Sequence, residues 1–216
     1  MQTVIPDLYA SAPERLSFAP SVEIRAFLLR RRQGNLLVYN VRAGADDAGA
    51  IEELGGISQH YLNHWHEAEV GGDRVARTFA APLFCHENER QRVSKTFDVA
   101  GTFSGRHMID DDFEAIPIPG HTSGATAYLW DSGQHRCLFT GDSLYLRDGE
   151  WVAAVLESSD RASYVESLAL IKELEFDLLV PWAATAGQPF HAVTDKKDAR
   201  RRIDAILERL RGGGDH

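Results

Sequence analysis

The sequence is poor in cysteine. Its 216 residues contain only Cys85 and Cys137, and each lies inside an apolar stretch. Two thiols cannot form the disulfide framework on which small secreted domains depend. We therefore expect both cysteines to be buried free thiols.

The sequence also lacks a leader and any long apolar run. Residues 1–10 include Asp7 and have no basic segment followed by an uninterrupted apolar run, which a signal peptide requires. No other stretch approaches the length of a membrane span. These absences predict a soluble, cytoplasmic protein without a membrane partner.

Positive charge is scarce as well. The chain has 23 Lys and Arg against 32 Asp and Glu, which gives a formal net charge of -9. Such a chain repels phosphate backbones. The run Arg30-Arg31-Arg32 stands at an apparent hairpin tip, where solvated charges are common. We expect no nucleic-acid partner.

The remaining composition is that of an ordinary globular protein. Hydrophobic residues make up 44% of the chain and charged residues 25%. A chain of this length is within the reach of one hydrophobic core. We expect a single domain over residues 1–216.

The first half of the chain predicts strands and one short helix. The helix is expected over residues 46–54, because two glycines follow it as at a helix C-terminus. Gln33-Gly34-Asn35 predicts a hairpin turn. Glu87–Lys95 is compatible with a helix, and residues 96–108 are irregular enough for a lid or an interface. The expected strands are Val22–Arg31, Leu36–Val41, Ile57–Asn63, Val75–Ala80 and Pro82–Cys85.

The second half predicts strands followed by two amphipathic helices. Apolar residues recur at helical spacing over Ala162–Leu174, with Asp160 near the N-cap, and again over Asp195–Leu210. The expected strands are Phe113–Ile118, Ala125–Trp130, Arg136–Thr140 and Phe176–Val180. Two sheets faced by helices would satisfy this order of elements.

Two histidines follow the strand Ile57–Asn63 directly, in His64-Trp65-His66. Alternate residues of an extended chain project to the same side, so His64 and His66 would point both imidazoles at one place while Trp65 turns away. One metal ion could accept both. His60 lies on the same strand, and for it we expect a packed or surface role, with a place in a pocket beside the metal as the alternative.

Two further segments present possible metal ligands. Pro119-Gly120 forces a tight turn at a strand end and presents His121 from a fixed loop. Asp142 follows a glycine at the end of an apolar strand, where a carboxylate is costly to bury unless it is paired or bound to metal. The simpler interpretation of Asp142 is a turn residue.

These three segments, in this order, resemble the metallo-β-lactamase fold superfamily of glyoxalase II-like metallohydrolases. The hallmarks of that family are a Thr-His-x-His-x-Asp-His loop, a Pro-Gly-His-Thr turn and a Gly-Asp strand end. The resemblance spans nearly the whole chain and implies an α+β fold, a four-layer αββα sandwich of two mixed β-sheets flanked by helices. It identifies His64, His66 and His121 as ligands of the first metal ion and Asp142 as the bridging carboxylate.

The chain departs from the family pattern at the second metal ion. Ala68 and Glu69 replace an Asp and a His of the first motif, and Ala183 stands where the last His is expected. The second site has thus lost its private ligands. Because the missing Asp also orients the attacking water in this family, Glu69 is the candidate replacement, as a ligand to a displaced second ion or as the general base. The alternative interpretation of Glu69 is a solvated loop acid.

The combined interpretation is a mononuclear metal-dependent hydrolase. Three imidazoles around one divalent ion suit a hydrolytic site, with zinc favoured over iron or manganese. The catalytic candidates are Glu69 and Asp142. The expected substrate is a small molecule of ester, thioester, lactone or amide type. The alternative is a catalytically inactive relative that kept the fold and binds metal or a ligand.

Overall fold

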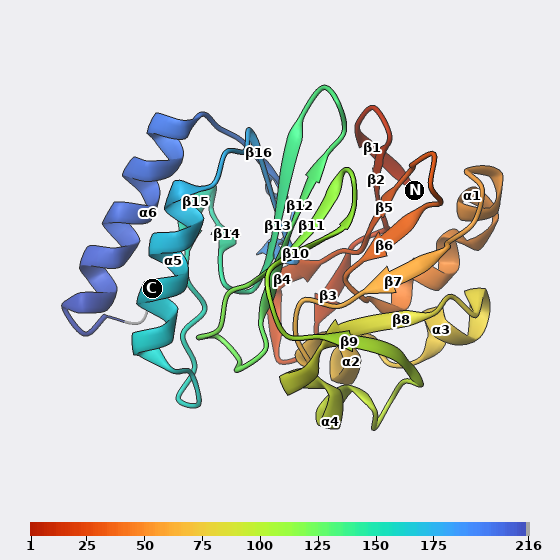
Figure 1. Cartoon of the computed structure of the whole chain (residues 1–216), viewed down its shortest axis with the longest axis horizontal. Coiled ribbons are helices and arrows are strands. Elements are labelled where there is room, and N and C mark those ends of the chain that lie inside the picture. Colours follow the sequence, from red (N-terminus) through yellow and green to blue (C-terminus); the bar gives the residue numbers. More distant parts are fainter. Residues whose placement is uncertain (215–216) are drawn as a thin grey trace. The chain divides into compact units, whose positions relative to one another are not determined.

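The computed structural model describes residues 1–214, and the chain forms two compact units. The first spans Met1–Phe103 and the second begins at Ser104, where the colours of Figure 1 pass into green. Each unit contains a mixed β-sheet and helices, which confirms the α+β class expected from the sequence. A single domain over residues 1–216 stays a prediction.

The first unit is built on a seven-stranded sheet of order β1-β2-β5-β6-β7-β8-β9. Neighbours from β1 to β6 are antiparallel, and those from β6 to β9 are parallel. The antiparallel β5–β6 pair confirms the hairpin expected at Gln33-Gly34-Asn35. The strands are β1 (Gln2–Ile5), β2 (Leu8–Ala10), β5 (Phe27–Leu29), β6 (Leu36–Val38), β7 (Gln59–Tyr61), β8 (Leu83–His86) and β9 (Val99–Phe103).

A single strand is expected over Val22–Arg31, but the structure has two strands there. The chain breaks between β4 (Ala19–Ile24), which pairs with β3 (Glu14–Leu16), and β5. Ser11 stabilises the break, because its N–H donates to Ala26 O at 2.9 Å and its Oγ accepts the Ala26 N–H at 3.1 Å. The apolar run could not reveal this break, since the residue that fixes it lies far away in sequence.

Short helices connect the strands of the first unit. Residues 46–54 are helical as expected, and Gly55 and Gly56 follow with φ of 108° and 76°. The helix expected in Glu87–Lys95 is confirmed by two consecutive helical segments, η2 and α4. The helical segments are η1 (Arg42–Asp47), α1 (Ala48–Glu53), α2 (His66–Gly71), α3 (Arg74–Phe79), η2 (Glu87–Glu89) and α4 (Arg90–Val93).

The strand expected over Val75–Ala80 is wrong, because this segment is helix α3. Ala80 adopts a left-handed conformation with φ of 52° and donates its N–H to Ala76 O at 2.8 Å, which ends the helix. Arg77 also pairs with Asp73 one turn earlier, at 3.1 Å. A short apolar run fits either a strand or a helix, and here the local end contacts decide.

The second unit is built on a six-stranded sheet of order β10-β11-β12-β13-β16-β18. Only the β13–β16 pair is parallel among the pairs described for this sheet. All four strands expected in this half are confirmed. The sheet strands are β10 (His107–Asp110), β11 (Phe113–Pro117), β12 (Thr126–Asp131), β13 (Arg136–Gly141), β16 (Leu178–Pro181) and β18 (Ala192–Val193).

Three shorter strands of this unit belong to another sheet, in which β14 (Tyr145–Arg147) pairs with β15 (Glu150–Val152) and β17 (Ala183–Thr185). The expectation that residues 96–108 are irregular is wrong for most of this segment. β9 pairs there with β8, and β10 pairs with β11. Their strand character comes from these partners, because each strand has two exposed residues and neither alternates strictly between apolar and polar residues.

Two long helices confirm those expected near the end of the chain, α5 (Arg161–Glu173) and α6 (Lys196–Arg211). They lie side by side (Figure 1). Asp160 caps α5 by accepting two N–H groups of its first turn, and Asp195 caps α6 by accepting the N–H of Asp198 at 2.8 Å. Within residues 1–214, no helix has the length and apolar character needed to traverse a bilayer.

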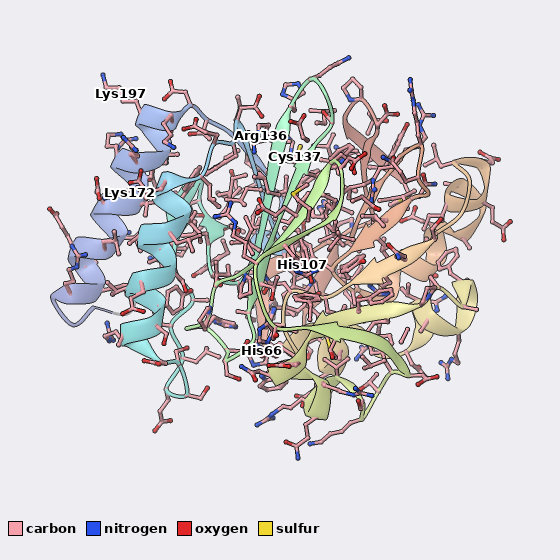
Figure 2. All side chains as sticks on the ribbon, viewed as in Figure 1. His66, His107, Arg136, Cys137, Lys172 and Lys197 are labelled. Carbon is pink, nitrogen blue, oxygen red and sulfur yellow. The ribbon has the colours of Figure 1, made fainter. Side chains whose placement is uncertain are left out.

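The buried core of the second unit joins its sheet to these helices. Ile116 and Leu129 of the sheet belong to one apolar cluster with Leu168 of α5 and Ile203 of α6. Both cysteines are free and buried, as expected, and Figure 2 marks Cys137 among the strands. Burial raises the pKa of Cys85 to about 12, so this thiol stays protonated and unreactive at neutral pH.

His60 makes the stability of the first unit depend on pH. Its ring is 1% exposed, its Nε2 donates to Tyr39 O at 2.9 Å, and burial lowers its pKa to about 4. The unfolded chain binds this proton near pH 6.5 and the folded chain does so only near pH 4, so acidification between these values favours unfolding. The packing role expected for His60 is confirmed.

We predict that the wild type loses up to about 3 kcal/mol of unfolding free energy relative to His60→Gln between pH 6.5 and pH 4. Gln keeps a donor for Tyr39 O and does not titrate. Urea unfolding at several pH values measures the difference. Parallel pH profiles for the two proteins would contradict it.

Candidate metal centre

His64 and His66 stand where strand β7 passes into helix α2. The extended geometry expected for His64-Trp65-His66 is wrong, because Trp65 has helical dihedrals (φ -69°, ψ -22°) and His66 is the first residue of α2. The two imidazoles nevertheless lie together, with ring centroids 4.9 Å apart and planes at 82°. The tight turn, rather than strand alternation, brings them to one place.

Glu67 holds His64 from behind. Its Oε1 accepts the backbone N–H groups of Asn63 at 2.9 Å and His64 at 3.1 Å, and it lies 3.1 Å from Nδ1 of the His64 ring. Both side chains are fully buried. Burial raises the pKa of Glu67, and the contacts with His64 and Asn63 oppose that rise.

Sequence reasoning did not single out Glu67. A usable signal was present, because an acid at the start of a helix often reaches back to N–H groups three or four residues earlier, as in a capping box. Asn63-His64-Trp65-His66-Glu67 has that spacing. The two neighbouring imidazoles are the more conspicuous feature of this segment.

Two more buried polar side chains fix the same turn. Glu89 Oε2 accepts the N–H of Trp65 at 2.8 Å. Asn40 Nδ2 donates to the backbone oxygens of Glu67 and Gly72, each at 3.0 Å. A Cβ at Gly71 would lie 2.2 Å from Asn40 Nδ2, so a side chain there would displace the amide. The turn that carries His64 and His66 is therefore rigidly supported.

In the second unit, the Pro119-Gly120 turn presents His121 as expected. Gly120 has φ of 144°, and a Cβ on it would lie 2.5 Å from the Cα of Tyr164 in helix α5. Ser167 of the same helix donates its Oγ–H to Pro119 O at 2.7 Å. Only glycine permits this close contact, which holds the turn against the helix.

The orientation of the His121 ring follows from one hydrogen bond. Its Nδ1 lies 2.6 Å from Ala154 O, and a carbonyl can only accept, so Nδ1 carries the proton and Nε2 carries the lone pair. Nε2 is 3.8 Å from Asp142 Oδ2. This separation is too long for a hydrogen bond and close to the roughly 3.3 Å between two ligands of a tetrahedral zinc ion.

Asp142 follows strand β13 directly. The preceding Gly141 has φ of 56°, which turns the chain out of the strand. The Tyr164 hydroxyl donates to Ser143 O at 2.8 Å, and burial raises the pKa of that hydroxyl well above its ordinary value. Helix α5 thus supports the backbone of both His121 and Asp142.

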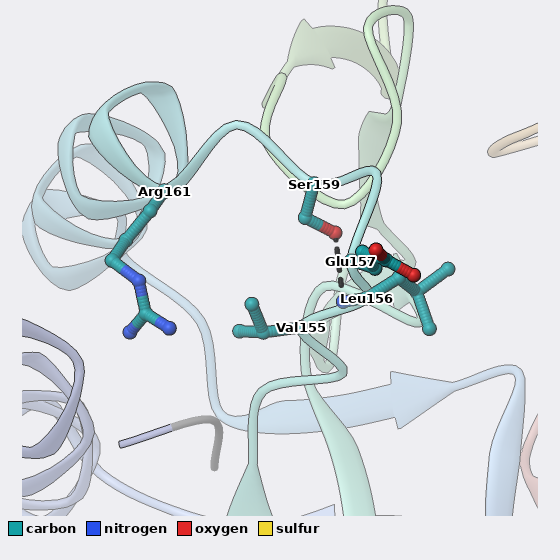
Figure 3. A pocket seen from close by; sticks show the side chains of 5 residues that line it. All are labelled: Val155, Leu156, Glu157, Ser159 and Arg161. Carbon is teal, nitrogen blue, oxygen red and sulfur yellow. Dashed lines mark hydrogen bonds between the residues drawn. The ribbon is translucent and has the colours of Figure 1, made fainter. Parts of the chain in front are cut away.

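The loop between β15 and α5 supplies the acceptor for His121 and also borders a pocket. The pocket has a volume of about 400 Å³ and is shown in Figure 3. Ser159 Oγ accepts the Leu156 N–H at 2.9 Å and donates to His121 O at 3.1 Å. The pocket is lined by Val155, Leu156, Glu157, Ser159 and Arg161.

Among the described residues, one group could hold a metal ion. Each member offers one ligand atom, and these atoms all lie within 4.8 Å of one another. The members are His64, His66, His121 and Asp142. Three imidazoles and a carboxylate are a donor set that suits a divalent transition metal, so the residues present fit such an ion.

The other sequence candidates stand apart from this group. Glu69 is exposed on α2, and its Oε1 lies 3.9 Å from Arg92. Ala68 and Ala183 are buried and offer no ligand atom. His86 caps η2 by accepting the N–H of Asn88 at 3.2 Å.

Comparison with known families agrees with this geometry. The model of the metallo-β-lactamase superfamily matches residues 49–183, a range that contains all four members of the group. The chain belongs to this superfamily. It is also 29% identical over 138 residues to YmaE, an uncharacterized protein of Bacillus subtilis (strain 168). That match covers 60% of this chain and about half of YmaE, at 50%.

Solved metallo-β-lactamases share the fold. DIM-1, in a structure exposed to ceftazidime, superposes with a TM-score of 0.74 at 14% identity and covers 96% of this chain and 95% of DIM-1. FIM-1 of Pseudomonas aeruginosa, in its mono-zinc form, gives a TM-score of 0.74 at 12% identity and covers 96% and 93%. These likenesses confirm the metallo-β-lactamase fold expected from the sequence.

Ala68 marks the chief difference from the family motif. Its side chain is fully buried in an apolar cluster with Leu62, Cys85 and Phe97. A carboxylate at this position would lose its hydration among side chains that cannot replace it. The surroundings of residue 68 are therefore adapted to a methyl group.

We predict that Ala68→Asp lowers the unfolding free energy by at least about 2 kcal/mol and does not add a second equivalent of bound metal. Urea unfolding of metal-free protein and metal analysis measure the two effects. Ala68→Ser, which adds a small uncharged group, is the matched control. A stable Ala68→Asp protein with two ions per chain would contradict the prediction.

Proposed function

We propose that this protein is a metal-dependent hydrolase that uses a single divalent ion held by His64, His66, His121 and Asp142. The observation that carries the proposal is the approach of these four ligand atoms to within 4.8 Å of one another. Zinc is favoured over iron or manganese because the set is rich in imidazole. FIM-1, of the same fold, has a mono-zinc form.

The chain's own residues prepare this site for the ion. When bound there, a divalent ion supplies Lewis-acid activation of water and of the substrate's reacting oxygen. Ala154 O keeps the proton of His121 on Nδ1 and thereby leaves Nε2 as the ligand atom. Asp142, with a side chain 18% exposed, adds the negative charge that three neutral imidazoles lack.

The proposed catalytic carboxylates are Asp142 and Glu69. Asp142 acts as a ligand. Glu69 would accept the proton of the attacking water in place of the Asp that Ala68 replaces. Its side chain is 49% exposed, and its contact with Arg92 at 3.9 Å is loose enough to permit another orientation.

The proposed substrate is a small molecule with an ester, thioester, lactone or amide bond. The pocket of about 400 Å³ beside the His121 loop is of the size that small-molecule sites have, about 300–1,000 Å³. The net charge of -9 disfavours nucleic acids. We further propose that the protein acts in the cytoplasm and that residues 1–216 form a single metallo-β-lactamase-like domain.

A second candidate function is binding without catalysis. The observation in its favour is the apolar environment of Ala68, which leaves no carboxylate at the usual water-orienting position. Such a relative would bind metal, or a small ligand, with the same four side chains. Metal content and turnover together separate the two functions.

We predict that protein purified without added metal contains about one equivalent of zinc per chain, and that His66→Ala and His121→Ala remove most of it. Loss of one of four ligands weakens binding strongly, because the remaining three cannot replace its contribution. Inductively coupled plasma mass spectrometry measures the content. His107→Ala, an exposed histidine on β10, serves as the control. Full zinc content in both ligand variants would refute the proposed site.

We predict turnover of at least one member of a panel of esters, thioesters, lactones, amides and phosphodiesters with zinc, manganese or iron. Glu69→Gln should then lower kcat about 100-fold or more, because a general base contributes that much. Glu53→Gln, at the end of α1, controls for the loss of one charge. Metal binding without any turnover would favour the binding function.

A further inference from the structure

The contact between Glu67 and His64 is more than a helix cap. Glu67 Oε1 already accepts two backbone N–H groups, from Asn63 and His64. A third contact, of 3.1 Å, joins the same oxygen to Nδ1 of the His64 ring. A cap needs only the backbone contacts, so the ring contact serves a different purpose.

The hydrogen-bonding pattern fixes the tautomer of His64. An oxygen that accepts two N–H groups serves as an acceptor for its third partner too, so Nδ1 of His64 carries the proton and donates it. The lone pair of the neutral ring then resides on Nε2. His121 is arranged in the same way by Ala154 O, although there the acceptor is a neutral carbonyl.

Burial of the Glu67 carboxylate lowers the stability of the fold, which argues that Glu67 has a role other than stabilisation. Its side chain is fully buried, and its Oε2 has no hydrogen-bond partner among residues 1–214. A buried carboxylate with an unsatisfied oxygen destabilises a fold unless another interaction compensates. A neutral Gln would have kept an acceptor oxygen for both N–H groups without burying a charge.

We propose that Glu67 is the positioning residue of the metal centre. It holds His64 in the Nδ1–H tautomer, directs Nε2 to the ion, and places a negative charge behind the ring that makes Nε2 a stronger ligand. The inference rests on the proposed function, because it takes His64 to be a ligand. Glu67 itself touches neither the ion nor the substrate.

Three variants separate the effect of the Glu67 charge, the effect of its distance from His64 Nδ1 and the effect of the net charge of the protein. Glu67→Gln keeps the length and the acceptor oxygen and removes the charge. Glu67→Asp keeps the charge and withdraws it by one methylene from Nδ1. Glu53→Gln removes one charge from α1, at a residue that is not a member of the ligand group, and serves as the control. Circular dichroism of each metal-free protein verifies its fold, and Glu67→Gln retains the acceptor that the backbone requires.

Zinc affinity, measured by competition with a chromophoric chelator, is the first readout. We expect the dissociation constant to rise about 10-fold or more in both Glu67 variants and to stay unchanged in Glu53→Gln. The second readout is the nitrogen NMR spectrum of the histidines in metal-free protein. We expect a Nδ1-protonated His64 in the wild type and a growing Nε2-protonated form in Glu67→Asp.

The outcomes distinguish this inference from the proposed function. Wild-type affinity for zinc in both folded Glu67 variants, or a Nε2-protonated His64 in the wild type, would overturn the positioning role. A wild-type protein that binds no zinc would instead defeat the proposed function. The tautomer of His64 would even then show whether Glu67 orients the ring.

Discussion

The candidate metal centre depends on hydrogen bonds that hold two of its imidazole rings. Each bond is made by Nδ1, the ring nitrogen that does not face the proposed ion. A neutral imidazole has one donor and one acceptor, and it can present its lone pair in a defined direction only if its other nitrogen is held. Glu67 does this for His64 and Ala154 O does it for His121. Each acceptor comes from the same unit as the ring that it holds, so each half of the ligand set is oriented by its own unit.

The packing around these acceptors keeps them in place. In the first unit, Asn40 binds two backbone oxygens of the α2 segment, and only a glycine at position 71 leaves room for its amide. In the second unit, Gly120 lets helix α5 approach the turn that carries His121. Close backbone packing thus converts two loops into rigid supports, as ligand positioning requires.

Much of the fold was accessible from sequence, because its longer elements carry local signals. The helices α5 and α6 have apolar spacing and an acidic N-cap, and the strands β11, β12 and β13 are bounded by turn residues. Two of the failures were segments whose state is set elsewhere in the chain. The break at Ala26 depends on Ser11, and the strands within residues 96–108 depend on their partners in the sheet.

The candidate site was predictable for a different reason. His64, His66, His121 and Asp142 stand in short motifs whose residue types are those of metal ligands, and these four are the ones the structure groups together. Glu67 was not predictable in this way. Its role depends on complete burial and on three contacts with two residues, and a sequence shows neither burial nor distance. Glu69, two residues further along, is equally acidic and is exposed.

The balance of charge bears on the proposal that the centre holds one ion. With neutral imidazoles, a divalent ion and Asp142 together leave one positive charge in a largely buried place, and such a charge is costly when nothing compensates it. The buried carboxylate of Glu67 would supply the compensation, and it lies directly behind a ligand ring. A second divalent ion would restore the excess, while Ala68 offers it no carboxylate. If the proposed function holds, the electrostatic requirement that makes a buried Glu67 tolerable favours one ion over two.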